Sequence, residues 1–308
     1  MSLEFLVIAN PASGRRRGPE LARRAVEGLR AAGRSAELFL TEGPGGAGVR
    51  ARHALDEGVA TIVGCGGDGT LQELADVVAA TPVRMGILPG GRCNDLARAL
   101  GLHRKDSLEK LLAPLLSDAF RRIDVARYSP LDGRPPKRYC TVATLGFDSA
   151  VTEFVRTHRF PVRGSAEYVY GVLRVLLSFR PPVVRLTGDF GTFEGPITLA
   201  ATANSAYYGG AMRIAPDARV DDGQLDLCVV DALPRETIVR VLPLVFSGRH
   251  TEHSSVRMLR TRKVEIEVLE GSPNLCADGE ILGSAPAYLE CEPGALKICS
   301  EFSTSETT

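Results

Sequence analysis

The sequence lacks net charge, closely spaced cysteine pairs and long apolar runs. Lysine plus arginine number 37, as do aspartate plus glutamate, so the overall charge favours neither nucleic acid nor anionic lipid as a partner. The seven cysteines are scattered and form no Cys-x-x-Cys pair, which argues against a disulfide framework and against a zinc site. We therefore expect a protein of a reducing compartment that does not bind nucleic acid.

Segments that would target or cross a membrane are also missing. The start, MSLEFLVIAN, has no basic region before its apolar residues and predicts a strand rather than a signal peptide. The longest apolar stretch, YVYGVLRVLLSF at 168–179, contains an arginine and is shorter than the roughly 20 residues that span a bilayer. The expected localisation is cytoplasmic, without a transmembrane segment.

The first third of the chain alternates between strand and helix patterns. Short apolar runs that predict strands are followed by segments in which apolar residues recur every three or four positions. The predicted strands are 3–9, 35–40, 60–64 and 84–90, and the predicted helices are 18–33, 48–58, 70–80, 94–101 and 107–117. This alternation predicts a Rossmann-like α/β domain with a mostly parallel sheet, in which ligands bind beyond the carboxyl ends of the strands.

Strand patterns dominate from about Ile123 onward. The predicted strands are 138–147, 182–190, 196–205, 224–232, 254–261, 263–269 and 287–293, with helical patterns near 147–157, 166–179 and 235–243. Turns such as Asp132-Gly133 and Glu270-Gly271 separate many of them, which predicts an antiparallel β-sandwich. We expect an α/β domain over 1–122 and a β-sandwich domain over 123–308. The C-terminal strands, at about 288–303, are candidates to complete the first domain.

The segment IVGCGGDGTLQELA, 62–75, contains four glycines within six residues and one acid among them. Glycines let backbone N–H groups approach phosphate oxygens, and the following helix presents its N-terminus to negative charge. A strand-to-helix turn alone would need only one or two glycines, and Thr70 with Glu73 also fits a capping box. Asp68 beside a phosphate site predicts a divalent cation or a proton-acceptor role.

Two further loops follow predicted strands at the same edge of the sheet. NPASG, 10–14, is by itself an ordinary turn, but its position predicts a second phosphate-contacting loop. In ILPGGRCNDLARALG, 87–101, either Asn94 or Asp95 is expected to cap the next helix, which leaves the other and Arg92 as candidates for nucleotide contact. Thr41, at the end of the second strand, fits a turn cap or a nucleotide contact equally well.

Two acidic segments of the second domain each have two interpretations. DARVDDGQLDL, 217–227, fits a hairpin turn or a divalent cation held by Asp222 and neighbouring carbonyls. LCADGEIL, 275–282, fits an Asp-Gly hairpin or two carboxylates, Asp278 and Glu280, at i and i+2 on one strand face. The apolar residues on both sides predict a carboxylate of raised pKa in this segment, and hence a general base.

Together these motifs resemble the diacylglycerol kinase catalytic-domain family of lipid kinases, in particular its soluble bacterial members, which are related to sphingosine and ceramide kinases. The motifs follow the family's order over most of the chain: Asn10-Pro11 with Ser13-Gly14, Gly66–Thr70, Pro89–Gly91 with Asn94-Asp95, Asp222-Gly223 and Asp278–Glu280. One departure is Arg92, which stands where the family usually has threonine and would replace a hydroxyl contact by a guanidinium.

The resemblance implies an NAD-kinase-like α/β domain, a β-sandwich domain, and a site for ATP and Mg²⁺. It implies that Glu280 is the proton acceptor near Asp68, with Asp278 as a further catalytic residue. It also implies a structural Mg²⁺ held by the side chain of Asp222 and the carbonyls of Arg219 and Gln224. The residues expected at ATP are Asn10, Pro11, Ala12, Ser13, Gly14, Thr41, Gly66, Gly67, Asp68, Gly69, Thr70, Leu71, Gln72, Glu73, Arg92, Asn94 and Asp95.

The expected activity is transfer of the γ-phosphoryl group of ATP to a lipid hydroxyl, with diacylglycerol as the substrate and phosphatidic acid as the product. Monoacylglycerol, phosphatidylglycerol, a sphingoid base and ceramide stay open as acceptors. An NAD or sugar kinase is a weaker alternative, because ANSAYYGGA, 203–211, lacks the Gly-Ser-Thr of an NAD kinase. The intact Asp68, Asp278 and Glu280 disfavour an inactive nucleotide sensor or lipid carrier.

A lipid substrate implies transient peripheral contact with a membrane. The segment 166–179 is the candidate, helped by Arg163 and Arg174, and the alternative is a helix that covers the core of the sandwich. Its apolar candidates are Tyr168, Tyr170, Leu173, Leu176, Leu177 and Phe179. A homodimer through the second domain is compatible with the sequence.

Overall fold

We describe residues 3–13, 17–158 and 165–301 in a computed structural model of the chain. They fall into two compact units. Unit 1 comprises the residues up to Val125, the segment Val220–Asp222 and the residues from Glu292 onward, and unit 2 comprises Ala126–Arg219 and Gly223–Cys291. The last part of the chain therefore joins the first part in unit 1. The contribution of Val220–Asp222 to unit 1 was not expected from the sequence.

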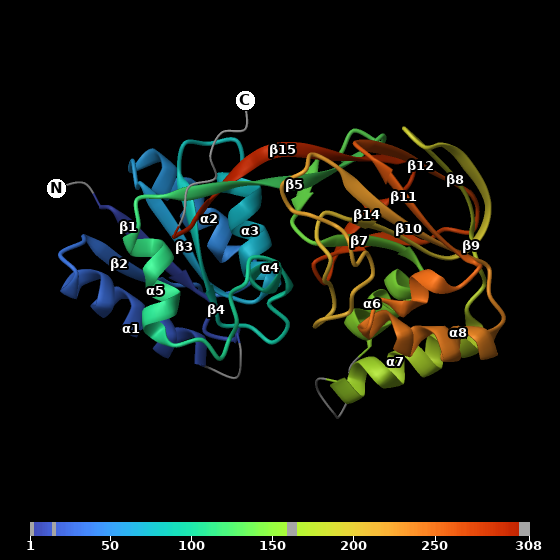
Figure 1. Ribbon diagram of the computed structural model, residues 1–308, viewed down its shortest axis with the longest axis horizontal. Coiled ribbons are helices and arrows are strands. Elements are labelled where there is room, and N and C mark those ends of the chain that lie inside the picture. Colours follow the sequence, from blue (N-terminus) through green and yellow to red (C-terminus); the bar gives the residue numbers. More distant parts are fainter. Residues whose placement is uncertain (1–2, 14–16, 159–164, 302–308) are drawn as a thin grey trace. The chain divides into compact units, whose positions relative to one another are not determined.

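Unit 1 is an α/β domain. Its parallel strands lie in the order β4-β3-β1-β2, and the end of β15 pairs in parallel with β4. Helices α1 and α5 pack on one face of this sheet, and α2 and α3 pack on the other (Figure 1). The elements are β1 (Phe5–Ala9), α1 (Arg17–Ala31), β2 (Ala36–Leu40), α2 (Gly46–Asp56), β3 (Thr61–Gly66), α3 (Asp68–Val78), β4 (Arg84–Pro89), α4 (Asp95–Ala99), α5 (Leu108–Leu116), the start of β5 (Phe120–Pro130) and the end of β15 (Ala287–Cys299).

The apolar patterns explain why these segments form these elements. All five residues of β1 and all six of β3 are buried, as expected for central parallel strands covered on both faces. Helix α1 buries a stripe at helical spacing that includes Ala22, Val26 and Leu29. A Cβ on Gly86 would lie 2.4 Å from the side chain of Leu115, so glycine lets α5 pack closely on β4.

The order of the strands brings the predicted ligand loops to one edge. Strands β1, β2, β3 and β4 are parallel, so the residues that follow them lie at the same carboxyl edge of the sheet. The chain reverses its direction of winding between β1 and β3, and ligands bind at such a point in open α/β sheets. The loops after Ala9, Leu40, Gly66 and Pro89 are therefore positioned to form one site.

Unit 2 is an antiparallel β-sandwich. The first half of β9 pairs with β8, whereas its second half pairs with β7 and β10, so β9 runs from one sheet into the other. Its helices gather on one side of the strands (Figure 1). The elements are the rest of β5 and β15, β6 (Lys137–Tyr139), β7 (Val142–Gly146), α6 (Phe147–Thr157), α7 (Ser165–Ser178), β8 (Val183–Gly188), β9 (Gly191–Ala203), β10 (Leu225–Asp231), α8 (Arg235–Val241), the 3₁₀ helices η2 (Leu242–Phe246) and η3 (Arg249–Glu252), β11 (Val256–Thr261), β12 (Lys263–Glu270), β13 (Asn274–Ala277) and β14 (Glu280–Ser284).

Alternation along the strands builds the core of unit 2. Val184 and Leu186 on β8 and Val264 and Ile266 on β12 are buried, while their neighbours along each strand are more exposed. Strands β13 and β14 form an antiparallel hairpin around Asp278-Gly279. The sequence analysis did not predict β5, β13 or β14 as separate strands, although it allowed an Asp-Gly hairpin in this segment.

Two features that the sequence lacks, a membrane-spanning segment and paired cysteines, can be compared with the structure. Within the described residues, there is no helix with the length and apolar character needed to span a membrane. All seven cysteines are free thiols, in agreement with the expected lack of a disulfide framework.

Candidate functional site

Two glycine loops of unit 1 meet backbone to backbone. A Cβ on Gly91 would lie 2.2 Å from the Cα of Gly67, and the amide of Gly90 donates a hydrogen bond of 3.0 Å to the carbonyl of Gly66. Glycine is therefore required at Gly91 by the packing of the loops that follow β3 and β4. Part of the glycine content of the loop after β4 has this structural cause.

Gly69 is different, because the packing of the described residues does not require glycine there. It lies in the first turn of α3 without a left-handed backbone, and a Cβ would have no described atom within 4 Å. The N-cap of this helix, Gly67, makes no side-chain hydrogen bond to it. The first turn of α3 thus has open space beside Gly69 among the described residues. The N-terminus of a helix is a place where backbone amides bind phosphate.

Asp68 ties the two glycine loops together. Its carboxylate accepts hydrogen bonds from the amides of Asn94 (2.8 Å), Asp95 (2.7 Å) and Leu96 (3.4 Å) and so caps α4 from another loop. The expectation that Asn94 or Asp95 caps this helix was wrong. Asn94 has a left-handed backbone, and its side chain instead accepts from the amide of Gly91 and donates to its carbonyl.

A pair of carboxylates lies in this loop region. Oxygens of Asp68 and Asp95 and the sulfur of Cys93 all lie within 4.8 Å of one another. Burial and the charge of Asp95 raise the pKa of Asp68, and burial raises the pKa of the Cys93 thiol to about 11. The thiol is therefore protonated at neutral pH, whereas two adjacent carboxylates suit a hard cation such as Mg²⁺. The donor set fits that cofactor.

Thr41 and Glu73 mark the neighbouring loop. The Thr41 side chain is 5% exposed, and its hydroxyl has no hydrogen-bond partner among the described residues. The Glu73 carboxylate accepts from the amides of Gly45 (2.8 Å), Ala47 (3.1 Å) and Gly48 (3.2 Å), and so caps α2. The predicted capping box of Thr70 and Glu73 was therefore wrong, because Glu73 serves a different helix.

The remaining residues predicted at ATP lie around these loops. The side chain of Asn10 accepts from the amide of Ala12 (2.9 Å) and so shapes the loop after β1. Arg92 is exposed at the tip of the loop after β4. Gly14 lies outside the described residues. The ATP contacts themselves stay predictions.

In unit 2 the hairpin of β13 and β14 presents the two predicted carboxylates. Asp278 has a left-handed backbone (φ 50°) in the turn, where it accepts hydrogen bonds from the amide of Cys140 (2.9 Å) and the hydroxyl of Thr141. The two acids are therefore not i and i+2 of one strand, as was expected, because only Glu280 belongs to β14. The predicted proximity of Glu280 to Asp68 stays a prediction.

Glu280 is held by a residue that sequence reasoning missed. Arg156, near the end of α6, forms an ion pair of 2.9 Å with Glu280 and donates 2.7 Å to the carbonyl of Gly279. The Glu280 side chain is 50% exposed, so the expected apolar burial is absent. No pattern in the sequence distinguishes Arg156 from other arginines on helix faces.

The acidic segment 217–227 contains a turn, and two of its acidic side chains form ion pairs with arginines. Gly223 has a left-handed backbone (φ 69°), in agreement with a turn at Asp222-Gly223. Asp221 forms an ion pair of 2.6 Å with Arg121, and Asp226 lies on β10, 3.5 Å from Arg260. The ligand set of Arg219, Asp222 and Gln224 for a structural Mg²⁺ stays a prediction.

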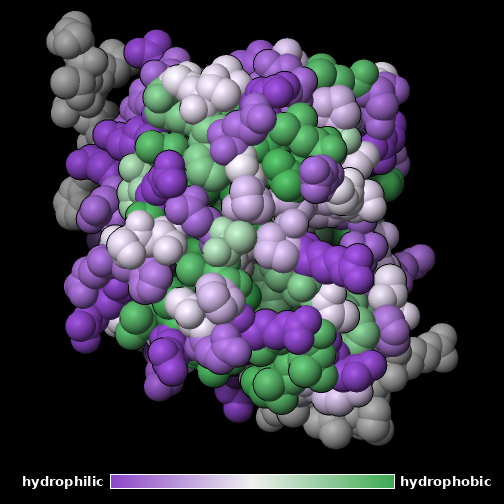
Figure 2. Space-filling view, turned by 90° about the vertical axis from the view of Figure 1, so that its right-hand side faces the viewer, coloured by the Kyte–Doolittle hydropathy of each residue, from purple (hydrophilic) through white to green (hydrophobic). Residues whose placement is uncertain are grey.

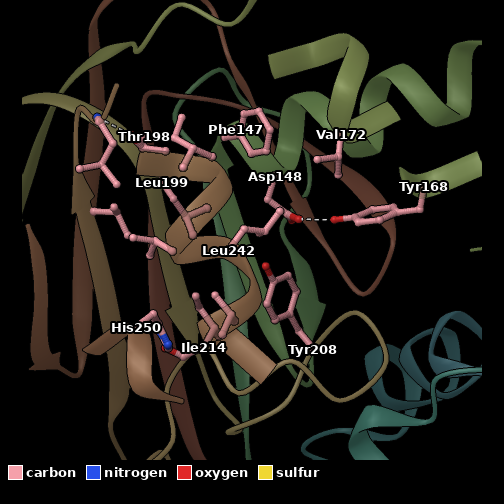
Figure 3. A pocket seen from close by; sticks show the side chains of 15 residues that line it. Phe147, Asp148, Tyr168, Val172, Thr198, Leu199, Tyr208, Ile214, Leu242 and His250 are labelled. Carbon is pink, nitrogen blue, oxygen red and sulfur yellow. Dashed lines mark hydrogen bonds between the residues drawn. The ribbon is translucent and has the colours of Figure 1, made fainter. Parts of the chain in front are cut away.

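Unit 2 also contains an apolar pocket that the sequence analysis did not predict (Figure 3). It encloses about 60 Å³. Its walls come from α6, α7, β9, β10, α8, η2 and η3, and most of its side chains are apolar. The lining residues are Phe147, Asp148, Tyr168, Val172, Thr198, Leu199, Tyr208, Ile214, Val230, Leu233, Ile238, Val241, Leu242, Val245 and His250.

Two protein-family models match this chain, one over its N-terminal part and one over most of the rest. Residues 4–128 match the diacylglycerol kinase catalytic domain, and residues 141–300 match the YegS C-terminal NAD kinase beta sandwich-like domain. A diacylglycerol kinase of Mycobacterium tuberculosis is 33% identical and covers 94% of this chain and 93% of its own length. A protein of Pseudomonas aeruginosa that is described as a probable YegS-like lipid kinase is 32% identical to this chain. The match covers 92% of this chain and 91% of the length of that protein.

A solved structure shows the same fold. A diacylglycerol kinase from Bacillus anthracis superposes with a TM-score of 0.71 at 20% identity, over 96% of both chains. The fold is thus an N-terminal α/β domain followed by a β-sandwich-like domain, as the sequence predicted. The protein belongs to the diacylglycerol kinase family of lipid kinases, a family of phosphotransferases that use ATP.

Proposed function

We propose that the protein transfers the γ-phosphoryl group of ATP to a lipid hydroxyl, with diacylglycerol as the acceptor and phosphatidic acid as the product. The observation that carries this proposal is the open space at Gly69. That space lies in the first turn of α3, and the carboxylates of Asp68 and Asp95 stand at the starts of α3 and α4, with ligand atoms within 4.8 Å of each other. A phosphate chain with a divalent cation has the charge and the donor needs that this arrangement meets.

In this proposal the glycine loops bind the phosphates of ATP. The amides at the N-terminus of α3 contact phosphate oxygens. The hydroxyl of Thr41, which has no partner among the described residues, contributes a further hydrogen bond to the nucleotide. Asp68 and Asp95 would hold Mg²⁺, which would neutralise charge on the transferring phosphoryl group. Arg92 is exposed and supplies a guanidinium contact to phosphate in place of a hydroxyl.

Glu280 is the proposed proton acceptor for the lipid hydroxyl. Its half-exposed carboxylate is accessible to a substrate, and Arg156 fixes its direction. Asp278 acts by anchoring the turn that carries Glu280, through its hydrogen bonds to Cys140 and Thr141. The second Mg²⁺, at Asp222 with the carbonyls of Arg219 and Gln224, is proposed to be structural.

The substrate is tested by transfer of radiolabelled phosphate from γ-labelled ATP, with Mg²⁺, to lipids in mixed micelles. The panel is diacylglycerol, monoacylglycerol, phosphatidylglycerol, a sphingoid base and ceramide, with NAD and a sugar as controls. We expect label in phosphatidic acid. Label in another lipid would correct the substrate and keep the reaction, whereas label only in NAD or the sugar would contradict a lipid kinase.

Helix α7 is the proposed site of transient membrane contact by a cytoplasmic protein. Leu173 and Leu177 are 55% and 62% exposed, whereas Leu176 is buried and Phe179 packs against Phe147. In Figure 2 a group of hydrophobic residues lies in the lower part of unit 2, the part in which Figure 1 places this helix. The segment is therefore both a membrane candidate and a cover for the core. Arg163 lies outside the described residues. A homodimer through unit 2 stays a prediction.

Membrane contact is tested by co-sedimentation with vesicles of phosphatidylglycerol and phosphatidylcholine. The variant with Leu173→Glu and Leu177→Glu is expected to stay in the supernatant, because charged side chains resist transfer into the bilayer surface. A matched control carries Leu131→Glu and Leu269→Glu, two exposed leucines that lie in the turn after β5 and on β12. Equal binding by both variants would reject α7 as the contact.

A further inference from the structure

Neighbouring strands of unit 2 begin or end at the same side of one sheet, next to Glu280. Strands β14, β13, β7 and β9 lie in that order, and each is antiparallel to the next. Ala277, the last residue of β13, pairs with Glu280 of β14 and with Ala143 of β7. Val142, the first residue of β7, pairs with Ala203, the last residue of β9. The short segments just beyond these pairs, 140–141, 204 and 278–279, therefore lie side by side.

The turn that carries Glu280 is a two-residue hairpin loop. Asp278 and Gly279 both have left-handed backbones, with φ angles of 50° and 80°, and the pair of Ala277 and Glu280 closes the loop. A left-handed backbone is less favourable for a residue with a side chain than for glycine. The conformation at Asp278, and with it the direction in which Glu280 leaves the turn, therefore depends on support from the surroundings.

That support comes from the corner between β6 and β7. The Asp278 carboxylate accepts a hydrogen bond of 2.9 Å from the amide of Cys140 and another from the hydroxyl of Thr141. Cys140 and Thr141 are 2% and 3% exposed, so water competes little for these bonds. The position of the turn is thus coupled to the position of this corner.

Asn204 holds the same corner from its other side. This residue follows β9, is 0% exposed, and donates a hydrogen bond of 3.0 Å from its Nδ2 to the carbonyl of Cys140. Its own amide donates 2.8 Å to the carbonyl of Thr141. The backbone of Cys140 is therefore bonded on both sides, through its amide to Asp278 and through its carbonyl to Asn204. This arrangement restricts rotation of the peptide groups that support Asp278.

The opposite side of the turn is held by Arg156. Its guanidinium donates 2.7 Å to the carbonyl of Gly279 and forms the ion pair of 2.9 Å with Glu280. Arg156 is an exposed side chain, whereas the corner and Asn204 are buried. The buried side is therefore the more rigid of the two supports.

We propose that Asn204 and Thr141 are positioning residues for Glu280. Both act through Asp278 rather than on the substrate, and they keep the turn at a fixed place relative to the strands. A general base must lie about 2.6–3.2 Å from the hydroxyl whose proton it accepts, so a small displacement of the turn lowers the rate. The inference rests on the proposed function, in which Glu280 is the proton acceptor. It gives a role to Asn204 in the motif ANSAYYGGA.

A set of substitutions with nearly constant shape tests this inference. Thr141→Val removes the hydroxyl that bonds to Asp278, whereas Thr141→Ser keeps it. Asn204→Leu removes the donor to the Cys140 carbonyl at similar side-chain size. Thr261→Val is the matched control at another buried threonine, whose hydroxyl donates 2.6 Å to the carbonyl of Lys263 between β11 and β12.

Each variant is assayed for kcat and for KM of ATP, with the lipid that accepts most label in the panel above, and for stability by urea unfolding. We expect Thr141→Val to lower kcat about tenfold and Asn204→Leu to lower it about threefold, because the base loses its orientation. KM for ATP should not change. Thr141→Ser should recover most of kcat, and Thr261→Val should lose stability without loss of kcat. If Thr141→Val does not fold, Asn204→Leu carries the same test.

A double-mutant cycle with Glu280→Gln separates positioning from a purely structural role. A residue that acts only by orienting the carboxylate has no effect on kcat once the carboxylate is gone, so Thr141→Val should cause no further loss of kcat in the Glu280→Gln background. Its effect on stability should be the same in both backgrounds. An equal loss of kcat in both backgrounds would show that Thr141 maintains the fold and would overturn the inference.

The outcomes also distinguish this inference from the proposed function. A large loss of kcat in Glu280→Gln, together with wild-type kcat in folded Thr141→Val and Asn204→Leu, would keep the proton acceptor and reject the positioning residues. Wild-type kcat in Glu280→Gln would contradict the proposed proton acceptor itself, and the inference with it.

Discussion

The candidate sites of the two units are built from different parts of the chain. In unit 1 the candidate phosphate site is built mainly from backbone, where the first turn of α3 has open space beside Gly69 and the loops touch at Gly67 and Gly91. In unit 2 the candidate groups are side chains from separate elements: Glu280 on β14, Arg156 on α6 and Asn204 after β9.

This difference follows from the chemistry of the two sites. Phosphate is bound by amides that a glycine-rich turn presents in one short stretch, so it leaves a readable motif. A proton acceptor is one side chain, and the residues that orient it come from neighbouring strands and helices. These residues leave no linear signature, and only their position in the fold identifies them.

The strongest test of the unit 1 site is a substitution that removes the charge of Asp68. Asp68→Asn keeps the size of the side chain but removes the negative charge that fits Mg²⁺, and we expect kcat to fall about 10³-fold, by analogy with loss of a preorganised electrostatic group. Steady-state phosphate transfer measures this. Thermal unfolding is the control, and wild-type activity in the folded variant would show that Asp68 only caps α4.

The corresponding test in unit 2 separates Glu280 from its partner. Glu280→Gln should lower kcat about 10²-fold or more, the range for a general base. Arg156→Gln should lower it only about fivefold, because an exposed ion pair contributes about 1 kcal/mol or less. Transfer rates of both variants and of Arg156→Lys, which keeps the charge, give the comparison. An equal loss in Glu280→Gln and Arg156→Gln would assign the chemistry to the pair rather than to the carboxylate.

Two glycines of unit 1 should respond in opposite ways to the same substitution. Gly91→Ala places a Cβ against Gly67 and should lower the free energy of unfolding by about 1–3 kcal/mol. Gly69→Ala meets open space in a helix and should raise it by up to about 1 kcal/mol. Urea unfolding measures both values.

The Gly69→Ala variant also tests the phosphate site, through the KM for ATP. If ATP occupies the space at Gly69, Gly69→Ala should raise KM for ATP about tenfold despite its stability, because a Cβ blocks the close approach of phosphate to backbone. An unchanged KM in this variant would remove Gly69 from the nucleotide site.

Glu73 is expected to stabilise the fold rather than to take part in the chemistry. Glu73→Ala removes the acceptor for three amides at the start of α2 and should lower the free energy of unfolding by about 1 kcal/mol. Glu73→Gln keeps one acceptor oxygen and should lose less. Equal destabilisation by both changes would mean that charge, rather than hydrogen bonding, holds α2.

The smallest expected effect is the pH dependence of stability at Asp148. Its pKa is raised above the ordinary 3.8 by burial, so the stability from its proton is present below that pH and is lost as pH rises through the folded-state pKa. The stability of Asp148→Asn relative to wild type should therefore increase from pH 4.5 to 7.5 in urea unfolding.

Asp132→Asn is the matched control with the opposite sign. Hydrogen bonds from Arg134 lower the pKa of Asp132, so its contribution is present above pH 3.8 and is lost as pH falls toward the folded-state pKa. Its relative stability should be constant over pH 4.5 to 7.5. A parallel response of both variants would show that Asp148 is not distinguished by burial.

The predictions from sequence were most accurate where local rules act alone. The alternation of apolar runs predicted the helices and parallel strands of unit 1, and Gly66–Thr70 lies at the strand-to-helix turn that was expected. The capping predictions failed, because Asp68 and Glu73 bond to amides that lie 25–28 residues away in the chain. A capping rule considers only neighbours along the chain, whereas these carboxylates are placed by the packing of adjacent loops.

The sequence alone determined the alternation of helices and parallel strands in unit 1, the glycine turns and the family, because each depends on contiguous residues with fixed backbone needs. Tertiary structure decided which groups meet. It placed Arg156 at Glu280 and brought the hydroxyls of Tyr168 and Thr144 to Asp148. The physical reason is that hydrogen bonds and apolar contacts act over a few ångströms in space, and folding sets those distances independently of separation along the chain.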